Sequence, residues 1–321
     1  MLDEHPAFAV AGRVDRAERA IDWLQVNNAD IILLDIEMPD RDGLAALPDI
    51  IAAGRGARIV MVSSSTAHGA SVTLRALAGG AADAIEKPNV GGLNRHFGID
   101  LIERLLRIGF SEQSATTSAK QNFLLRLVAT GPVPIVAIGS STGGLHALAR
   151  FFAALPPTFD APILVTQHLP ASFMPFFADQ LSMMSQRPCS VARDGAVAAR
   201  GAIYVAPGIA HLMCERRGSK IIMRLQPEEV SNHSLPSVDP MFASVAAAFG
   251  SQGVGIVLSG MGRDGAEGAV LLARAGADVI VQDEATSVIW GMPGAVARAG
   301  SASMCAPAEE LARHLVSRGT R

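Results

Sequence analysis

The chain has 321 residues and a formal net charge of -3, which allows two domains with separate cores and gives no general attraction to nucleic acid or to an anionic membrane. Although 49% of the residues are hydrophobic, no apolar stretch approaches the roughly 20 residues of a membrane span, and the N-terminus lacks a secretory signal, so we expect a cytoplasmic protein without membrane insertion. Three scattered cysteines and eight histidines without metal-ligand spacing argue against a disulfide framework or a zinc site.

The first part of the chain alternates short strand-like runs with helical ones. Strands are predicted at 8–14, 30–35, 58–62 and 83–85, and helices at 16–26, 43–53, 69–78 and 93–108. Such alternation is typical of parallel βαβ units. The sequence therefore predicts a first domain over 1–110.

Three polar residues close successive strands of this domain. Asp35, Ser63 and Lys87 bring a carboxylate, a hydroxyl and an ammonium group to neighbouring strand ends. This set suits phosphoryl transfer, because the carboxylate can accept the group while the hydroxyl and the cation hold its oxygens. Taken alone, Asp35 could equally cap the following helix.

A polar segment rich in serine and threonine follows the last helix of this domain. It predicts a linker over 111–132. From residue 133 onward strand and helix patterns alternate again, with glycine at many strand ends. The sequence thus predicts a second doubly wound α/β domain over 133–321.

The second domain opens with a glycine-rich turn. A strand-like run over 133–138 breaks into Gly-Ser-Ser-Thr-Gly-Gly at 139–144, and a helical pattern begins at Leu145. A serine in such a turn exposes its hydroxyl near backbone N–H groups, a setting for a nucleophile or for an anion. Nucleotide binding is the competing interpretation, but the turn lacks the lysine of a P-loop and the third glycine of the dinucleotide fingerprint.

Two further strand ends offer the partners that a serine nucleophile needs. His168 follows the run 163–167, and Asp264 follows the run 255–258. In an open parallel sheet these ends share one edge with Ser141, where a histidine can take the hydroxyl proton and a carboxylate can orient the histidine. Each residue also has a structural interpretation, as a hydrogen-bonded histidine and as a turn aspartate.

Six short motifs in this order resemble the chemotaxis protein-glutamate methylesterases, which are two-domain response regulators. The motifs are residues 138–144, Gln-His-Leu-Pro at 167–170, Val-Ala-Pro-Gly at 205–208, Pro-Ser-Val-Asp at 236–239, Gly-Met-Gly-Arg-Asp-Gly at 260–265 and Gly-Met-Pro at 291–293. The resemblance implies that Ser141 is the nucleophile, His168 the base and Asp264 its orienting carboxylate. It also implies that Thr142 and Met261 support the serine site and the oxyanion. Residues 232–239 are expected to line the substrate cleft, and neither His211 nor His233 is assigned any chemistry.

The activity that the resemblance implies is hydrolysis of glutamate methyl esters on methyl-accepting chemoreceptors, without a catalytic cofactor. Some members of the family also deamidate glutamine. A chemotaxis histidine kinase would be the phosphodonor, and the unphosphorylated receiver would cover the active-site cleft. Two functions of other classes stay open, a signalling adaptor that has kept only the fold and a nucleotide-binding sensor.

The first domain resembles the receiver of two-component signalling, especially at 60–64 and 72–77, and this implies that Asp35 is phosphorylated. Receivers begin with a strand that ends in an acidic pair for Mg²⁺, and this chain has no counterpart of it. Phe8–Val14 aligns with the second strand of the family. We therefore predict a flavodoxin-like receiver that lacks its first strand, and we favour a missing N-terminal segment over a degenerate domain. Mg²⁺ binding and phosphorylation both stay open.

Overall fold

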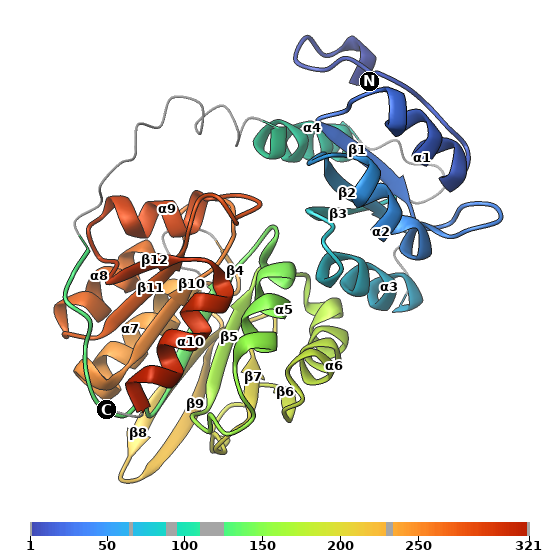
Figure 1. Ribbon diagram of the computed structural model, residues 1–321. Helices are drawn as coiled ribbons and strands as arrows, with labels where there is room; N and C mark the ends of the chain where they lie inside the picture. Colours follow the sequence, from blue (N-terminus) through green and yellow to red (C-terminus); the bar gives the residue numbers. More distant parts are fainter. Residues whose placement is uncertain (1, 64–66, 88–94, 110–124, 229–233, 320–321) are drawn as a thin grey trace. The chain divides into compact units, whose positions relative to one another are not determined.

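The structure is a computed structural model in which residues 2–63, 67–87, 95–109, 125–228 and 234–319 are described. The chain divides into two compact units, Met1–Lys120 and Gln121–Arg321 (Figure 1). Each unit combines a parallel sheet with helices, which confirms the predicted α/β class. The two units are described one at a time.

The first unit holds a three-stranded parallel sheet in the order β1-β2-β3. Its strands are β1 (Ile31–Asp35), β2 (Arg58–Ser63) and β3 (Asp83–Glu86). Its helices are the short η1 (Leu2–Glu4), α1 (Ala17–Val26), α2 (Gly43–Ala53), α3 (Ala67–Ala78) and α4 (Arg95–Gly109). Asp42 caps α2 by accepting a hydrogen bond from the Ala45 N–H group at 2.7 Å, which helps to fix the turn that follows β1.

The strand predicted over Phe8–Val14 is wrong, because this segment forms no regular element. It instead passes over Trp23 of α1, so closely that a Cβ atom on Gly12 would lie 2.8 Å from the indole ring. A strand needs a neighbouring strand to receive its hydrogen bonds, and the alternating pattern of the sequence does not reveal whether one is in place. Among the described residues β1 pairs with β2 alone, and Leu33 in its middle is 40% exposed.

The second unit is built on a seven-stranded parallel sheet in the order β12-β11-β10-β4-β5-β7-β6. Its strands are β4 (Val136–Ser140), β5 (Ile163–Gln167), β6 (Cys189–Val191), β7 (Ile203–Val205), β10 (Val254–Val257), β11 (Asp278–Gln282) and β12 (Met304–Ala306). A separate antiparallel hairpin pairs β8 (His211–Arg217) with β9 (Lys220–Gln226). The central strands are buried along their whole length, as expected of a parallel sheet covered on both faces.

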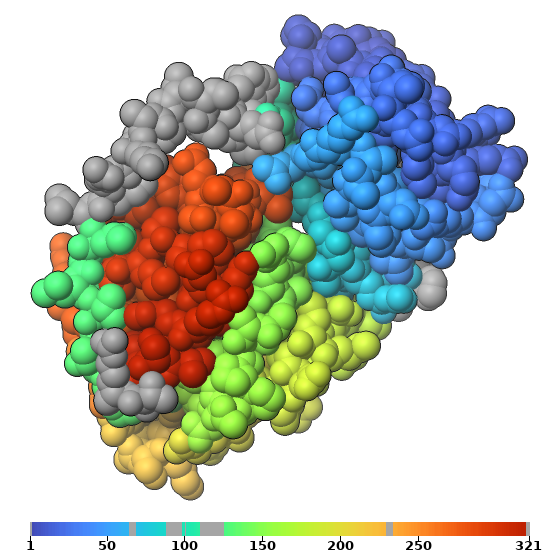
Figure 2. All heavy atoms as spheres, viewed as in Figure 1, coloured from blue at the N-terminus to red at the C-terminus, as the bar shows by residue number. Residues whose placement is uncertain are grey.

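Helices cover both faces of this sheet. One face carries α5 (Gly144–Ala154), α6 (Met174–Ser185) and α10 (Ala308–Gly319), and the other carries α7 (Val238–Phe249), α8 (Ala266–Arg274), α9 (Gly291–Arg298) and the hairpin. Figure 2 shows α10, in red, beside the green α5. Arg150 of α5 donates a hydrogen bond from Nε to Glu309 Oε2 of α10 at 3.1 Å.

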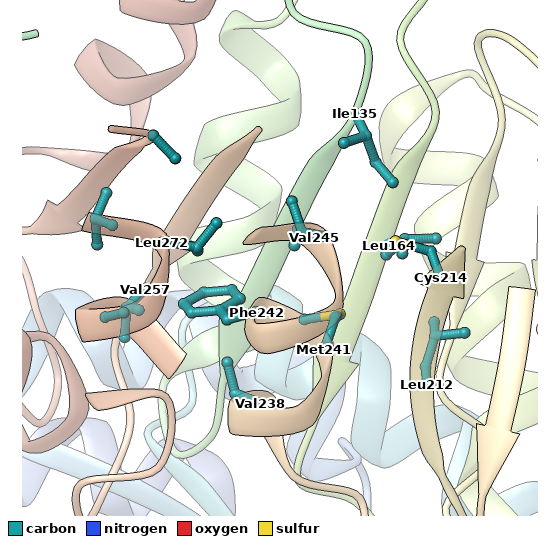
Figure 3. Packing of buried hydrophobic residues seen from close by; sticks show 14 of the residues in the cluster. Ile135, Leu164, Leu212, Cys214, Val238, Met241, Phe242, Val245, Val257 and Leu272 are labelled. Atoms are coloured by element: carbon teal, nitrogen blue, oxygen red, sulfur yellow. The ribbon is translucent and has the colours of Figure 1, made fainter. Parts of the chain in front are cut away.

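Helix α7 presents a continuous apolar stripe to the core of the second unit. Val238, Met241, Phe242 and Val245 recur at the spacing of one helix face, and all four are fully buried. Figure 3 shows them among Leu164 and Val257 of the sheet and Leu272 of α8. This packing fixes the position of the first turn of α7, which lies at the site described below.

Part of the predicted linker already belongs to the second unit. The Arg126 N–H group donates to Ala302 O at 2.9 Å, and the Ala129 N–H group donates to Asp278 Oδ1 at 2.7 Å. Residues 125–132 form no helix or strand, so the composition alone did not reveal this attachment.

Candidate active site

The candidate site lies where the chain order of the large sheet reverses. The first strand of the unit, β4, is flanked by β5 on one side and by β10 on the other. Ligand and catalytic sites of open parallel sheets form at such a switch point, beyond the carboxyl ends of the strands. Ser141 follows β4, His168 follows β5, and Asp264 lies in the loop after β10.

The strand register brings Ser141 and His168 together. Ser140 and Gln167 are paired across β4 and β5, so Ser141 and His168 occupy the next position on adjacent strands. The His168 N–H group donates to Ser140 O at 3.2 Å, which holds the two strand ends together. Neighbouring parallel strands lie about 4.8 Å apart, so this register places both side chains at one point of the edge.

The turn that carries Ser141 is tighter than the sequence predicted. The strand continues to Ser140 instead of ending at Ile138, and α5 begins at Gly144. Gly143 has a φ of 75°, and a Cβ atom there would lie 2.4 Å from Val288 Cβ. A side chain at Gly143 would therefore be strained and would clash, which explains why this turn needs a glycine.

The backbone groups of Ser141 are already engaged. Its N–H group donates to Ser259 O at 3.0 Å, and its carbonyl accepts hydrogen bonds from the Gly144 N–H group at 2.8 Å and from Gln167 Nε2 at 2.9 Å. An oxyanion formed here must therefore find its donors in other N–H groups. The buried Gln167 also accepts a hydrogen bond from Ser140 Oγ at 2.6 Å. The side-chain amide of Gln167 therefore holds both Ser140 and Ser141.

The resemblance assigns Thr142 and Met261 to the oxyanion, and both lie in segments that adjoin Ser141. Thr142 follows Ser141 directly, and its carbonyl accepts a hydrogen bond from Ser259 Oγ at 2.8 Å. Met261 follows Gly260, where a Cβ atom would lie 3.0 Å from Ser141 Cβ and 2.3 Å from Met292 Sδ. The loop after β10 thus reaches Ser141 through a position where any side chain would collide.

His168 and Asp264 form a close pair. His168 Nε2 lies 2.7 Å from Asp264 Oδ2, and the side chains are 23% and 3% exposed. With Nε2 facing the carboxylate, Nδ1 is the ring nitrogen that remains for a proton from Ser141. A buried carboxylate in this place holds the tautomer of the histidine and stabilises its cation.

Asp264 has a second carboxyl group beside it. Burial raises the pKa of Asp264, but hydrogen bonds from His168, from Ser237 and from the Val238 N–H group outweigh burial and bring this pKa below its usual range. Burial raises the pKa of Asp239 to about 6, and the negative charge of Asp264 adds to this effect. Two adjacent carboxyl groups do not readily ionise together, so Asp264 keeps its negative charge while Asp239 binds a proton more readily.

Both ring nitrogens of His211 have hydrogen-bond partners in the protein. The residue is buried, its Nδ1 accepts a hydrogen bond from the Ser237 N–H group at 2.9 Å, and its Nε2 lies 2.8 Å from Glu228 O. Since Nδ1 accepts, Nε2 is the nitrogen that donates to Glu228 O. His233 and the first residues of the expected cleft lining lie outside the described residues.

The polar residues of the first unit also meet at strand ends. Lys87 Nζ lies 2.8 Å from Asp35 Oδ1, and the Lys87 N–H group donates to Ser63 O at 2.7 Å. The hydrogen bond with the Asp35 carboxylate raises the pKa of Lys87 above its ordinary value. This ion pair lies at the edge where the sequence predicts phosphoryl chemistry.

In the described part of the chain, no group of three or more histidine, cysteine, aspartate or glutamate side chains has the geometry to hold a metal ion. Asp35 Oδ1 accepts a hydrogen bond from the Glu37 N–H group at 2.9 Å in addition to facing Lys87. Mg²⁺ is usually held by one or two carboxylates together with water, so Asp35 is the residue at this edge that would hold it.

None of the described helices combines the length and the apolar character that a membrane span requires.

Comparisons with known proteins agree with this geometry. Residues 136–315 match the family model described as CheB methylesterase, and residues 1–94 match the response regulator receiver domain. A protein-glutamate methylesterase/protein-glutamine glutaminase of Caulobacter vibrioides is 40% identical, with 98% of this chain and 93% of that protein covered. A protein of the same name from Rhodospirillum rubrum is 36% identical, with 98% and 90% covered. The crystal structure of the Thermotoga maritima CheB methylesterase catalytic domain is 35% identical, with a TM-score of 0.56, and 58% of this chain and 98% of that one are covered.

Proposed function

The chain belongs to the CheB methylesterase family, and we propose that it hydrolyses glutamate methyl esters on methyl-accepting chemoreceptors through Ser141, His168 and Asp264. One observation carries this proposal: His168 Nε2 lies 2.7 Å from Asp264 Oδ2, and His168 follows β5, the strand that pairs with β4, which Ser141 follows. The substrate class is supported by the names of relatives that match almost the whole chain. Their place of action would be the cytoplasmic part of the receptors.

The reaction begins when Ser141 Oγ attacks the ester carbonyl and His168 Nδ1 takes the hydroxyl proton. Asp264 remains ionised and stabilises the imidazolium, in keeping with its lowered pKa. Backbone N–H groups other than that of Ser141 hold the oxyanion, and the resemblance assigns this support to Thr142 and Met261. His168 then returns its proton to the methoxy oxygen, and methanol leaves as the acyl-enzyme forms.

The second half of the reaction uses the same groups. His168 takes a proton from water, the hydroxide attacks the acyl carbon, and Ser141 leaves with the proton from His168. The products are free glutamate and regenerated enzyme. We propose that no cofactor takes part, and that glutamine is deamidated by the same steps with ammonia as the leaving group. The names of the relatives support both activities.

We further propose that Asp35 is the phosphoacceptor of the first unit, with a chemotaxis histidine kinase as phosphodonor. Lys87, 2.8 Å from Asp35, would hold an oxygen of the phosphoryl group, and Ser63 closes the neighbouring strand. Asp35 would also be the carboxylate that holds Mg²⁺, which would supply charge neutralisation for the phosphoryl group. Phosphorylation would raise the esterase activity of the second unit.

The test is methanol release from methylated chemoreceptor membranes. We expect release by the full chain, none by Ser141→Ala, and faster release by a shortened chain that begins at Gln121. Circular dichroism verifies that each variant is folded. If folded wild-type protein releases no methanol and a serine-directed fluorophosphonate does not label Ser141, the esterase assignment is overturned in favour of an adaptor.

A further inference from the structure

The first turn of α7 supplies three hydrogen-bond donors to the carboxylate of Asp264. Ser237 Oγ donates to Oδ1 at 2.7 Å, the Val238 N–H group donates to Oδ2 at 2.8 Å, and the Asp239 N–H group reaches Oδ1 at 3.3 Å. His168 Nε2 lies 2.7 Å from Oδ2. The sequence connects residues 237–239 to Asp264 only through a shared family pattern.

Ser237 is the side chain among them, and each of its polar groups is used. The residue is 0% exposed, and its N–H group donates to His211 Nδ1 at 2.9 Å. Its hydroxyl oxygen accepts a weak hydrogen bond from the Asp239 N–H group at 3.3 Å, while the hydroxyl proton is given to Asp264 at 2.7 Å. A residue that merely capped the helix would need to accept from the Asp239 N–H group, but it would not need to donate its hydroxyl proton to Asp264.

The two oxygens of Asp264 thus have separate tasks. Oδ1 accepts the short hydrogen bond from the Ser237 hydroxyl and the longer one from the Asp239 N–H group, while Oδ2 accepts from the Val238 N–H group and faces His168 Nε2. The last dihedral angle of an aspartate side chain is soft, so loss of the short Ser237 hydrogen bond, which leaves the 3.3 Å contact with the Asp239 N–H group on Oδ1, allows the carboxylate to turn. A turn of this group would misalign Oδ2 and His168.

We propose that Ser237 is a positioning residue of the catalytic site, which acts through Asp264 and thereby orients His168 toward Ser141. This inference rests on the proposed esterase function and extends it to a fourth side chain. The stripe that buries Val238, Met241 and Phe242 anchors the helix from which Ser237 acts. The hairpin contributes through His211, which holds the Ser237 backbone.

The chain offers a matched control in Ser244, on the same helix. Ser244 is also buried, its Oγ donates to Met241 O at 2.7 Å, and it accepts a hydrogen bond from the Cys214 N–H group at 3.0 Å. Ser244→Ala therefore removes a buried hydroxyl with two hydrogen bonds but touches no residue of the proposed triad. Ser237→Thr keeps the hydroxyl and suits the extended backbone of Ser237, with φ -116° and ψ 148°.

The experiment measures methanol release by the full chain over a range of pH, for wild type and the three variants. For Ser237→Ala we expect kcat to fall about tenfold with KM unchanged, because a small misplacement of a catalytic group slows the chemical step rather than binding. The acidic limb of the kcat/KM profile should move to lower pH, since an Asp264 carboxylate that has turned away from His168 stabilises the imidazolium less. Ser237→Thr should restore both quantities, and Ser244→Ala should change neither.

The charged and titratable groups around Asp264 on the described elements are His168 and Asp239, which contact it, His211, which contacts Ser237, and Arg263, which precedes Asp264 in sequence. None of them is altered in these variants. Equal kcat and an unmoved acidic limb in folded Ser237→Ala would overturn the positioning role, and so would equal losses in Ser237→Ala and Ser244→Ala. Failure of the esterase function itself is separate, because then wild-type protein would release no methanol.

Discussion

The carboxyl groups of Asp239 and Asp264 are neighbours at the start of α7 and differ sharply in their tendency to ionise. The Asp239 N–H group reaches Asp264 Oδ1 at 3.3 Å, and the Asp239 side chain accepts a hydrogen bond from the Gly268 N–H group at 2.7 Å. Asp264 has the stronger donors and a lowered pKa, whereas burial raises the pKa of Asp239 to about 6. The proposed catalytic carboxylate is therefore kept charged next to a group that readily holds a proton.

This pair predicts a pH-dependent effect of Asp239→Asn on stability. A carboxyl whose pKa is raised in the folded state contributes stability below its unfolded pKa and loses it as pH rises through the folded pKa, here from 3.8 to about 6. Asparagine can keep the Gly268 hydrogen bond without the charge. Relative to wild type, Asp239→Asn should therefore gain on the order of 1 to 2 kcal/mol between pH 4 and pH 8. Thermal unfolding at several pH values measures this, and an equal difference at pH 4 and pH 8 would contradict it.

Ser141 and Ser140 provide a test of which serine is the nucleophile. Ser141→Ala should lower kcat by about a thousandfold or more and abolish fluorophosphonate labelling. Ser140 Oγ is hydrogen-bonded to Gln167 inside the protein. Ser140→Ala should therefore cost about 1 kcal/mol of unfolding free energy, and the fluorophosphonate should still label Ser141 in this variant. Label on Ser140 in the wild type would reverse the assignment.

Asp264→Asn should separate orientation from proton transfer. An asparagine can accept the hydrogen bond from the Ser237 hydroxyl but carries no charge to stabilise a cationic His168, so we expect kcat to fall about a thousandfold or more. Methanol release at saturating substrate measures this. Asp239→Asn is the comparison and should keep kcat within a few-fold of wild type; equal losses in the two variants would mean that Asp264 has no special role.

Gly260→Ala tests the contact between the loop after β10 and the nucleophile. The added methyl group would lie 2.3 Å from Met292 Sδ and 3.0 Å from Ser141 Cβ, so the turn that carries Ser141 must shift. We expect kcat to fall by about a hundredfold. Gly262→Ala is the control, because Gly262 has a φ of 85° but nothing within 4 Å of the new Cβ atom. It should cost about 1 kcal/mol of stability with little change in kcat. Similar activity of the two variants would refute the contact.

Lys87→Ala tests the ion pair of the first unit. The two side chains are 34% and 39% exposed, so solvent and salt screen the pair and we expect a loss of at most about 1 kcal/mol of unfolding free energy. The pKa of Lys87 is raised by Asp35, so this contribution is present below the ordinary value of 10.5 and is lost only above it. Urea unfolding at pH 7 and low salt measures the difference; a loss that does not shrink in high salt would contradict a screened pair.

Much of the site could be predicted because its residues stand at strand ends. Ser141, His168 and Asp264 follow buried strands of one parallel sheet, and strand ends of such a sheet converge by construction. The roles of Ser237, Gln167 and Ser259 could not be predicted, because each depends on a hydrogen bond to a residue far away in the sequence. Only Ser237 carried a local signal, as a serine directly before a helical pattern.

The error at Phe8–Val14 has a different physical origin. Alternating apolar residues satisfy the local requirement for a strand, but the hydrogen bonds of a strand belong to its neighbour. The attachment of Arg126 and Ala129 to the second unit was hidden for the same reason, since both are held through backbone groups that composition does not register. Long-range pairing of the main chain was the missing information in both cases.

The hydrogen bond from the Ser141 N–H group to Ser259 O also sets when activity can arise during synthesis on the ribosome. A nascent chain that has emerged only through β9 contains the serine and the histidine, but neither the strand that steadies the serine turn nor the aspartate. Domains of this size fold as units once their parts are available. Ester hydrolysis should therefore begin only after the last third of the polypeptide has left the exit tunnel, and a truncated translation product should be unable to remove methyl groups from its receptors.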